Sequence, residues 1–485
     1  MLFRSDGASG SFVVGQTDKA GNDFRAKGRL KVTGERYLQF SGTGEYFLKG
    51  GADSPENFLA YKEFDGTYFG GDTVTRPGEA KVSINLHGYQ PHAGDWHEGD
   101  PVWQGGKGKN IIGALNYLAS KGVNSVYMLT MNVGGDGKDV WPWTGYDERY
   151  RFDCSKLDQW EIVFSHMDQL GIMQHLVTQE TENQRLLDDG DTGLQCRLYY
   201  RELVARFAHH QAVTWNLGEE NGTADFSPNG QTDQQRKDMA AYLKKINPYN
   251  NFVVIHTHSF EPARSEVIKP LLGCRDIDGL SVQVGDPLTS FSETAKWLDL
   301  SEQSGKKWVV SIDEIGHHTI GVKPDSADPG HDLVRKYVLW ANLMAGGGGA
   351  EWYFGYLFPD NDLSCEDWRS RENMWEQTRL AVDFFREYLP FNEMKNMNDI
   401  TSSGDDYCLA LEDKIYVVYV PVGGSTAIDL SHATGNFTVA WFDPRHGGAL
   451  QQGTLQLVTA GSRINTGLPP SETGMDWVVL LKKNL

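Results

Sequence analysis

Between residues 43 and 390, short apolar runs alternate with segments in which apolar residues recur at helical spacing. Eight of these runs have the length of a strand: 45–50, 124–130, 173–178, 212–217, 252–257, 278–283, 307–312 and 350–355. Two of the helical segments, 111–122 and 156–171, end at a glycine that can stop a helix. This alternation is typical of βαβ units. It predicts an α/β fold, a (β/α)₈ barrel, rather than an open sheet, because no G-x-G-x-x-G motif follows the first strand.

The pattern changes on both sides of this region. Residues 1–42 are rich in glycine and contain short alternating stretches, which indicate a β-structured lead-in. After residue 391 the helical periodicity ends, and short apolar runs separated by turn residues continue to residue 485. Such spacing is typical of a small antiparallel β-sandwich. We therefore predict a lead-in over 1–42, a catalytic barrel over 43–390 and a C-terminal β-sandwich over 391–485.

Composition and charge narrow the class of protein. Of 485 residues, 39 % are hydrophobic and 23 % are charged, which excludes a disordered chain. The net charge of −20 would repel a phosphate backbone, so we expect no nucleic-acid partner. No apolar run is long enough to predict a membrane span. Five cysteines without a C-x-x-C motif argue against a disulfide framework or a zinc ribbon.

Acidic residues follow three of the predicted strands. They are Glu180 and Glu182 after the third strand, Glu219 and Glu220 after the fourth, and Asp313 and Glu314 after the seventh. A single acidic pair at a strand end usually caps a helix or forms an ion pair. Several carboxylates converging on one barrel mouth repel one another, however, which indicates that the site uses them.

Two carboxylates on opposite sides of a pocket are what glycosidic cleavage requires. One is protonated and donates to the leaving oxygen, while the other is ionised and attacks the sugar or activates water. The fourth and seventh strands face each other across a barrel, which permits the separation of about 5–5.5 Å found in retaining enzymes. Neighbouring side chains of an extended strand point to opposite faces, so alternation alone leaves the choice between Asp313 and Glu314 open.

Two motifs resemble those of the large clan of retaining (β/α)₈ glycoside hydrolases. The stretch WNLGEEN at 215–221 resembles the Asn-Glu signature after strand four, in which the Glu is the acid/base. By that match Glu220 is the acid/base, although Glu219 stands where the clan usually has Asn. The stretch DEIG at 313–316 resembles the Ser-Glu-Phe-Gly motif after strand seven, which implies that Glu314 is the nucleophile.

Residues 45–390 also resemble a bacterial barrel family related to the apiosidase-like hydrolases. The stretches FLKGGADSPENF, WNLGEENG and GGAEWYFGY carry this resemblance. Members often have an N-terminal β-domain, not seen complete here, and a C-terminal module named for collagen binding, which AWFDPR at 440–445 resembles. The resemblance implies a glycoside hydrolase that cleaves a plant or algal polysaccharide or oligosaccharide. We expect a secreted or periplasmic protein, although the opening residues contain no signal peptide, and a cytoplasmic location stays open.

Residues near the strand ends are predicted to bind the carbohydrate substrate. They are Glu219, Glu182, Asn221, His258, Gln283, Asp313, His317, Trp352, Tyr353 and Trp143. Tryptophan and tyrosine rings offer flat apolar faces that suit the C–H face of a sugar. We predict no cofactor and no metal, because the histidines between His87 and His97 fit no zinc spacing.

Two other functions are open at this point. The departure from Asn-Glu after the fourth strand also fits a carbohydrate-binding protein that has lost catalysis. The loop from His87 to His97 would have to supply metal ligands if hydrolysis were metal-dependent. The pattern indicates neither the oligomeric state nor the sugar linkage.

Overall fold

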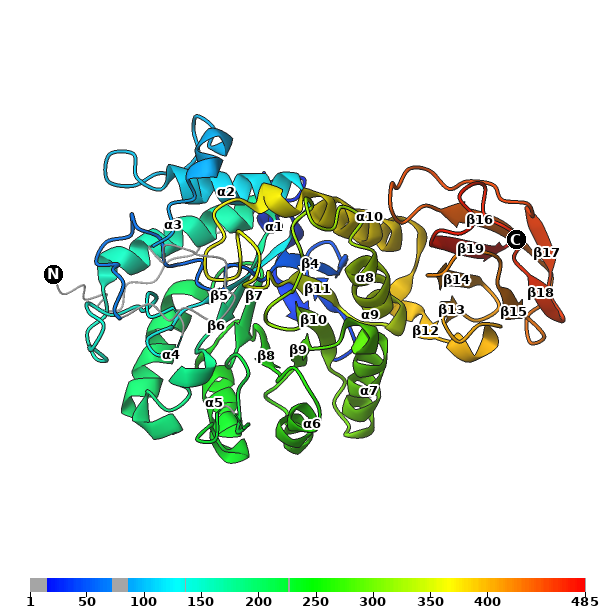
Figure 1. Cartoon of the computed structure of the whole chain (residues 1–485). Coiled ribbons are helices and arrows are strands. Elements are labelled where there is room, and N and C mark those ends of the chain that lie inside the picture. Colours follow the sequence, from blue (N-terminus) through cyan, green and yellow to red (C-terminus); the bar gives the residue numbers. More distant parts are fainter. Residues whose placement is uncertain (1–14, 72–85, 136, 226, 485) are drawn as a thin grey trace.

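The computed structural model describes residues 15–71, 86–135, 137–225 and 227–484. Eight parallel strands form a closed barrel in chain order (Figure 1). They are β4 (Lys49–Ala52), β5 (Ser125–Leu129), β6 (Met173–Val177), β7 (Val213–Asn216), β8 (Phe252–His256), β9 (Gly279–Val284), β10 (Val309–Ile315) and β11 (Gly349–Trp352). Each of the eight predicted runs overlaps one of these strands, so the predicted (β/α)₈ barrel is confirmed. The first predicted run, 45–50, begins too early, because it covers only the first half of β4 and residues 46–47 form a separate strand outside the barrel.

Helices surround the barrel. They are α2 (Lys109–Ser120), α3 (Cys154–Leu170), α4 (Leu194–Phe207), α5 (Asp233–Ile246), α6 (Ala263–Ile268), α7 (Ser290–Gln303), α8 (Asp332–Val334), α9 (Ala341–Ala345) and α10 (Glu372–Tyr388). A π-helical segment, Arg335–Trp340, joins α8 to α9. Helix α3 begins where the Asp153 side chain accepts from the Lys156 N–H, and it ends at Gly171, which adopts a left-handed conformation. No helix in the described parts of the chain is long and apolar enough to cross a membrane.

A small N-terminal unit closes one end of the barrel. It contains α1 (Phe24–Lys27) and the antiparallel strands β1 (Leu30–Val32), β2 (Leu38–Phe40) and β3 (Tyr46–Phe47). Its buried apolar side chains form one cluster with Met173, Ala212, Phe252 and Val309. Those four residues stand at the starts of barrel strands, so this sheet covers the amino-terminal end of the barrel and leaves the opposite end for a site.

The C-terminal part contains two antiparallel sheets. The larger has the order β12 (Lys395–Asn396), β13 (Tyr407–Leu411), β14 (Ile415–Val420), β19 (Trp477–Lys483), β16 (Asn436–Phe442) and β17 (Leu457–Thr459). The smaller pairs β15 (Ala427–Asp429) with β18 (Arg463–Asn465). Ile428 of the small sheet shares a core with Val418 and Trp441 of the large one. The predicted antiparallel β-structure is therefore present, and we refer to residues 395–483 as the C-terminal module.

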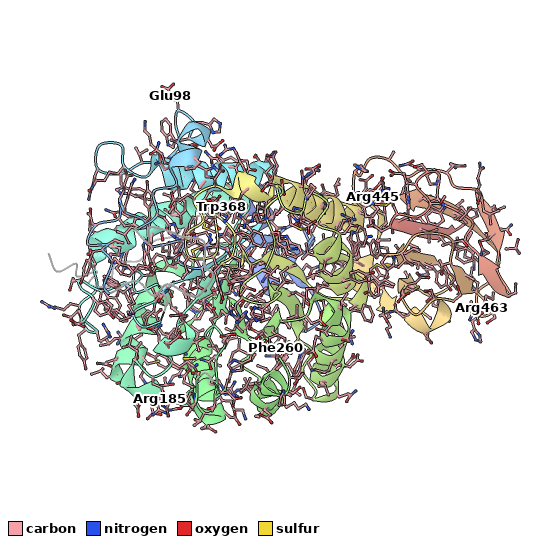
Figure 2. The ribbon with its side chains drawn as sticks, viewed as in Figure 1. Glu98, Arg185, Phe260, Trp368, Arg445 and Arg463 are labelled. Carbon is pink, nitrogen blue, oxygen red and sulfur yellow. The ribbon has the colours of Figure 1, made fainter. Side chains whose placement is uncertain are left out.

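The other face of the large sheet packs against the barrel helices. The rings of Trp340 and Tyr419 are stacked with centroids 5.0 Å apart. Arg335 Nη2 lies 2.9 Å from Asp476 Oδ1, and both side chains are buried. Arg463, in contrast, lies on the module away from the barrel (Figure 2). The module is thus attached through a desolvated interface.

Candidate active site

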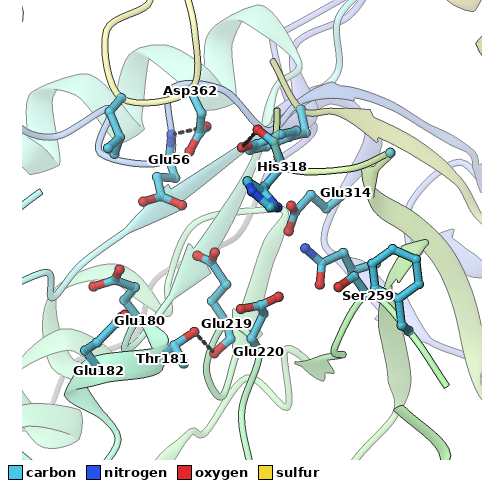
Figure 3. Close-up of a pocket in the computed structure, with 15 residues that line it drawn as sticks. Glu56, Glu180, Thr181, Glu182, Glu219, Glu220, Ser259, Glu314, His318 and Asp362 are labelled. Carbon is cyan, nitrogen blue, oxygen red and sulfur yellow. Dashed lines mark hydrogen bonds between the residues drawn. The ribbon is translucent and has the colours of Figure 1, made fainter. Parts of the chain in front are cut away.

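A cavity of about 400 Å³ lies at the carboxyl ends of the barrel strands (Figure 3). Its described lining consists of Glu56, Glu180, Thr181, Glu182, Glu219, Glu220, Ser259, Phe260, Gln283, Glu314, Gly316, His318, Tyr353, Asp362 and Leu363. Seven of these fifteen residues are carboxylic acids, and none is Lys or Arg. Such a lining creates a strongly negative potential and raises the cost of ionising any one member.

Glutamates from opposite sides of the barrel meet in this cavity. Glu219 and Glu220 follow β7, and Glu314 belongs to β10, which lies across the closed barrel from β7. Figure 3 shows the carboxyl groups of all three turned toward the same space. The geometry therefore brings together the acids predicted after the fourth and seventh strands.

A β-bulge in β10 explains how both acids of that strand face inward. Along the pairing with β9, Ile312 is opposite Val282 and Glu314 is opposite Gln283, so Asp313 is an extra residue. A bulge breaks the strict alternation of side chains. Asp313 is consequently directed into the barrel interior, where its Oδ1 lies 2.9 Å from Lys49 Nζ, while Glu314 reaches the mouth.

The backbone after β7 turns sharply at the two glutamates. The Glu219 N–H donates to the Gln179 carbonyl oxygen over 3.0 Å. The Glu220 N–H donates to His256 Nδ1 over 3.1 Å, and Glu220 has a φ of +38°. A positive φ is unfavourable for a residue with a Cβ and is concentrated at functional sites. This turn is what allows two consecutive residues to line one cavity.

Glu219 is set up to hold a proton. Burial and the neighbouring Glu220 and Asp362 carboxyl groups raise the pKa of Glu219 to about 8. The Tyr127 hydroxyl donates to Glu219 Oε2 over 3.1 Å, which opposes that rise. A carboxyl group with such a pKa is mostly protonated at pH 7 and can act as a donor.

Glu314 shares this environment. Burial, together with the charges of Glu219 and Glu220, raises the pKa of the Glu314 carboxyl well above its usual range. Gln283 opposes the rise by donating a hydrogen bond. Since part of the rise comes from neighbouring charge, protonation of Glu219 or Glu220 favours the ionised form of Glu314.

His256 contacts both sides of the site. Burial lowers the pKa of its imidazole to about 3, so the ring is neutral. Because Nδ1 accepts from the Glu220 N–H, the ring proton is on Nε2, which lies 3.6 Å from Glu314 Oε2. The sequence pattern predicted a site role for His258, two residues further on, and none for His256. In the sequence, the only indication of a role for His256 is that it is the last residue of its strand.

Several predicted residues line the cavity and others do not. Glu182, Gln283 and Tyr353 join Glu219, Glu220 and Glu314 in the lining. Glu56 and Asp362 also line the cavity, although the sequence pattern did not predict them; they lie in the loops after the first and last barrel strands. The Glu56 N–H donates to Asp362 Oδ1 over 3.2 Å, so these two loops are joined at the mouth.

Two predicted polar residues have their side chains directed into the protein instead. Asn221 is buried, and its Nδ2 donates to Gln231 Oε1 over 2.9 Å. Asp313 is bound to Lys49 as described above. The two predicted histidines are also outside the lining, since His258 is buried and His317 is exposed beside Thr319.

The two predicted tryptophans are core residues. Trp352 is fully buried, and its Nε1 donates to Thr378 Oγ1 of α10 over 2.8 Å, so its ring lies outside the barrel wall. Trp143 is also fully buried and packs against Tyr199, with ring centroids 5.6 Å apart. Neither ring reaches the cavity, and the aromatic lining is Phe260 and Tyr353.

A buried polar network lies inside the barrel. Lys49 Nζ is 2.9 Å from Asp313 Oδ1 and 3.2 Å from Glu351 Oε2. His175 Nδ1 lies 2.7 Å from the same Glu351 oxygen. Burial would raise the pKa of Glu351, but Lys49 and His175 hold it at about 2. His175, Asp313 and Glu351 are close enough to share a metal ion, but the Lys49 ammonium already contacts all three and supplies the positive charge.

The loop containing His87, His92 and His97 does not form a metal centre within the described residues. His87 bonds to Asn57 and Glu366, and His92 Nδ1 lies 2.9 Å from Asp95 Oδ2. No described group of three possible metal ligands contains a residue of this loop.

Comparisons with known proteins agree with this architecture. Residues 394–482 match the family model described as "Putative collagen-binding domain of a collagenase". The structure of a glycoside hydrolase aligns with a TM-score of 0.62 at 13 % identity, covering 95 % of this chain and 98 % of that chain. A family 5 glycoside hydrolase from Bacteroides vulgatus ATCC 8482 aligns with a TM-score of 0.62 at 14 % identity, covering 94 % of each chain. A search of curated proteins finds no match. At such identities the likeness shows a shared fold.

Proposed function

We propose that this protein is a retaining glycoside hydrolase, with Glu220 as the acid/base and Glu314 as the nucleophile. The observation that supports this proposal most is the meeting of Glu219 and Glu220 with Glu314 across one sugar-sized cavity. Paired carboxyl groups in different protonation states are the requirement for glycosidic cleavage. The fold shared with glycoside hydrolases is consistent with this assignment.

In the proposed first step, a Glu314 carboxylate oxygen attacks the anomeric carbon while the bond to the leaving oxygen breaks. Glu220 gives its proton to that oxygen, and a covalent glycosyl–enzyme forms. In the second step Glu220 removes a proton from water, the water oxygen attacks the anomeric carbon, and Glu314 leaves as a carboxylate. Gln283 donates to Glu314 and favours its charged form before attack and after release, and the His256 Nε2–H lies 3.6 Å from Glu314 Oε2.

Glu219 is the alternative proton donor. It holds a pKa of about 8 and accepts from Tyr127, whereas the resemblance places the donor at the next residue. If Glu220 is the donor, the protonated Glu219 adds no negative charge beside it and forms a hydrogen bond to a sugar hydroxyl. The two assignments differ in which variant loses general-acid catalysis.

The acidic lining of the cavity indicates the charge of the proposed substrate. Seven acids without Lys or Arg would repel a uronate or a sulfate ester. Carboxylates and carboxyl groups readily bond the hydroxyls of neutral sugars. Within the plant or algal polysaccharides that the resemblance implies, we therefore propose an uncharged glycoside, cleaved outside the cytoplasm.

The C-terminal module is proposed to support the barrel and not to bind substrate. Its large sheet is covered by barrel helices, as the Arg335–Asp476 pair and the stacking of Tyr419 on Trp340 indicate. The matching family model is named for collagen binding, but that name describes other members. We place its boundary with the barrel near residue 391.

The decisive experiment compares Glu219→Gln, Glu220→Gln and Glu314→Gln on a panel of neutral polysaccharides and aryl glycosides. We expect Glu314→Gln to lose at least 10³-fold in kcat on all substrates, because the nucleophile is removed. Glu220→Gln should lose about 10²–10⁴-fold on natural leaving groups and much less on dinitrophenyl glycosides, which need no protonation.

Azide gives an independent check on the donor. With the acid/base removed, azide should restore activity and yield a β- or α-glycosyl azide of retained configuration. Rescue of Glu219→Gln instead of Glu220→Gln would transfer the donor role to Glu219. Full activity in Glu314→Gln would refute the mechanism, and saturable oligosaccharide binding without any new reducing ends would support a non-catalytic carbohydrate-binding protein instead.

A further inference from the structure

Two histidines and a glutamate gather on the side of the barrel opposite the mouth. Glu161 lies on α3, and His209 and His210 lie between the end of α4 and the start of β7. One possible ligand atom from each residue lies within 4.8 Å of the other two. The start of a barrel strand is remote from the cavity at the strand ends, so this cluster plays no part in the proposed glycosidase.

The hydrogen bonds of both rings leave their Nε2 atoms directed at one carboxylate. His209 Nδ1 lies 2.8 Å from the Arg206 carbonyl oxygen, which can only accept, so the Nδ1 carries the proton. His210 Nδ1 lies 3.0 Å from Asp168 Oδ2, which fixes its proton in the same way. In their neutral forms, both rings therefore present an Nε2 lone pair.

Those lone pairs face the two oxygens of Glu161. His210 Nε2 is 3.2 Å from Glu161 Oε2, and His209 Nε2 is 3.4 Å from Glu161 Oε1. In the absence of a metal ion a proton on His210 Nε2 joins this ring to Glu161 Oε2 in a hydrogen-bonded ion pair, and a bound metal ion would replace that proton. Zinc ligands at about 2.0–2.1 Å in a tetrahedron are separated by about 3.3 Å, which matches these two distances.

The surroundings hold the three groups in place. His210 is buried, and the carboxylate of Asp168 behind it is the outer partner that metal-bound histidines commonly have. Arg29 donates to the carbonyl oxygens of Ala208, His209 and His210, which fixes the backbone of the turn. The His209 side chain is 49 % exposed, so an ion can enter and keep a water ligand.

We propose that Glu161, His209 and His210 form a binding site for a borderline divalent metal ion such as Zn²⁺. Two imidazoles and one carboxylate select Zn²⁺, Co²⁺ or Ni²⁺ over Ca²⁺ or Mg²⁺, which require oxygen ligands. The ion would link α3 to the turn before β7. The same turn is bound to the N-terminal sheet, because the Leu30 N–H donates to the Gln211 carbonyl oxygen, so the site has a structural role.

The test uses the full chain after treatment with a chelator and dialysis. We expect one equivalent of Co²⁺ to give the intense visible absorption of a four-coordinate site, and Zn²⁺ to displace it. Saturating Zn²⁺ should raise Tm by a few degrees because it binds only the folded state. The same concentration of Mg²⁺ should leave Tm unchanged.

His209→Ala is the main variant, since its half-exposed side chain can be removed without disturbing the core. This variant and Glu161→Gln should each weaken Zn²⁺ binding at least 100-fold. Asp168→Asn should weaken Zn²⁺ binding about 10–100-fold, because Asp168 orients the His210 ring. His446→Ala is the matched control, because Asp443, His446 and Glu472 form another described cluster of possible ligands. Absence of Co²⁺ absorption, or Zn²⁺ binding that His209→Ala leaves unchanged, would overturn the proposal.

Discussion

Glu219 is a carboxyl group whose folded environment opposes its ionisation. An unfolded Glu loses its proton near pH 4.3, whereas burial and Glu220 raise the pKa of the folded Glu219 to about 8. Between these values the folded protein binds more protons than the unfolded one, so this residue makes stability fall as pH rises from about 4 to 8.

Glu219→Gln should therefore raise Tm by several degrees at pH 8 and by little at pH 4.5, where the folded carboxyl is protonated and the unfolded one is only about half ionised. Thermal unfolding across this pH range measures the difference. Glu302→Gln serves as a control, because Glu302 is an exposed partner of Arg36 and its pKa is lowered, not raised. An equal effect of Glu219→Gln at both pH values would show that its carboxyl group is not destabilised by burial.

Tyr127 controls the same group from the other direction. Its hydroxyl donates to Glu219 and favours the charged form, so Tyr127→Phe should raise the pKa of Glu219 further. Among the kinetic consequences, the alkaline limb of kcat/KM should move upward by about 0.5–1 pH unit if Glu219 is the donor. An unchanged limb with reduced kcat would favour Glu220 as the titrating donor. Glycosidase assays at constant ionic strength distinguish the two results.

At the scale of elements, the bulge in β10 directs both Asp313 and Glu314 into the barrel. Asp313 lies deeper, beside Lys49, and Glu314 lies at the mouth. Lys49 of β4 neutralises Asp313 and Glu351 below the mouth, and all three side chains are buried. Removing one partner of a buried ion pair costs about 3–5 kcal/mol, because the other charge stays desolvated.

Lys49→Met should lower the free energy of unfolding by about that amount, as chemical denaturation would report. Lys31→Met on the exposed edge of β1 is the control and should change stability by less than about 0.5 kcal/mol. A Lys49→Met protein as stable as the wild type would mean that Asp313 and Glu351 are not held as ions.

Most of the barrel strands were predictable because they are short, nearly continuous apolar runs followed by polar residues. The exception is β4, whose sequence KGGA has no such run, and the prediction reached only its first two residues. The bulge was not, since inserting Asp313 changes the facing of a side chain without changing the apolar pattern. For the same reason Trp352 was misplaced: strands of a parallel barrel are buried on both faces, so apolar character does not distinguish the inward from the outward side. The inward turn of Glu56 and Asp362 depends on loop conformation, which carries no periodic signal.

At the scale of the whole molecule, the C-terminal module and the barrel share a buried interface. Arg335 donates to Asp476 through Nε and Nη2, at 3.0 and 2.9 Å, and Tyr419 donates to Asp476 over 2.7 Å. Because one carboxylate bonds groups on both sides, the two parts should unfold together in a single cooperative transition.

Asp476→Ala should lower Tm strongly, since it leaves Arg335 buried without its carboxylate. Arg463→Ala is a matched control, because that residue lies on the outer part of the module and pairs loosely with Asp429 at 3.9 Å. Calorimetry provides the measurement. Two separate transitions in the wild type would contradict this coupling between the module and the barrel.

The acid-rich lining of the cavity also affects how the protein should be handled at the bench. Protonated amines, including the buffer Tris and basic iminosugars, will concentrate where seven carboxyl groups meet and the described lining offers no Lys or Arg. Turnover measured in Tris should therefore be lower than in phosphate at equal pH and ionic strength, and the deficit should disappear as competing substrate is added.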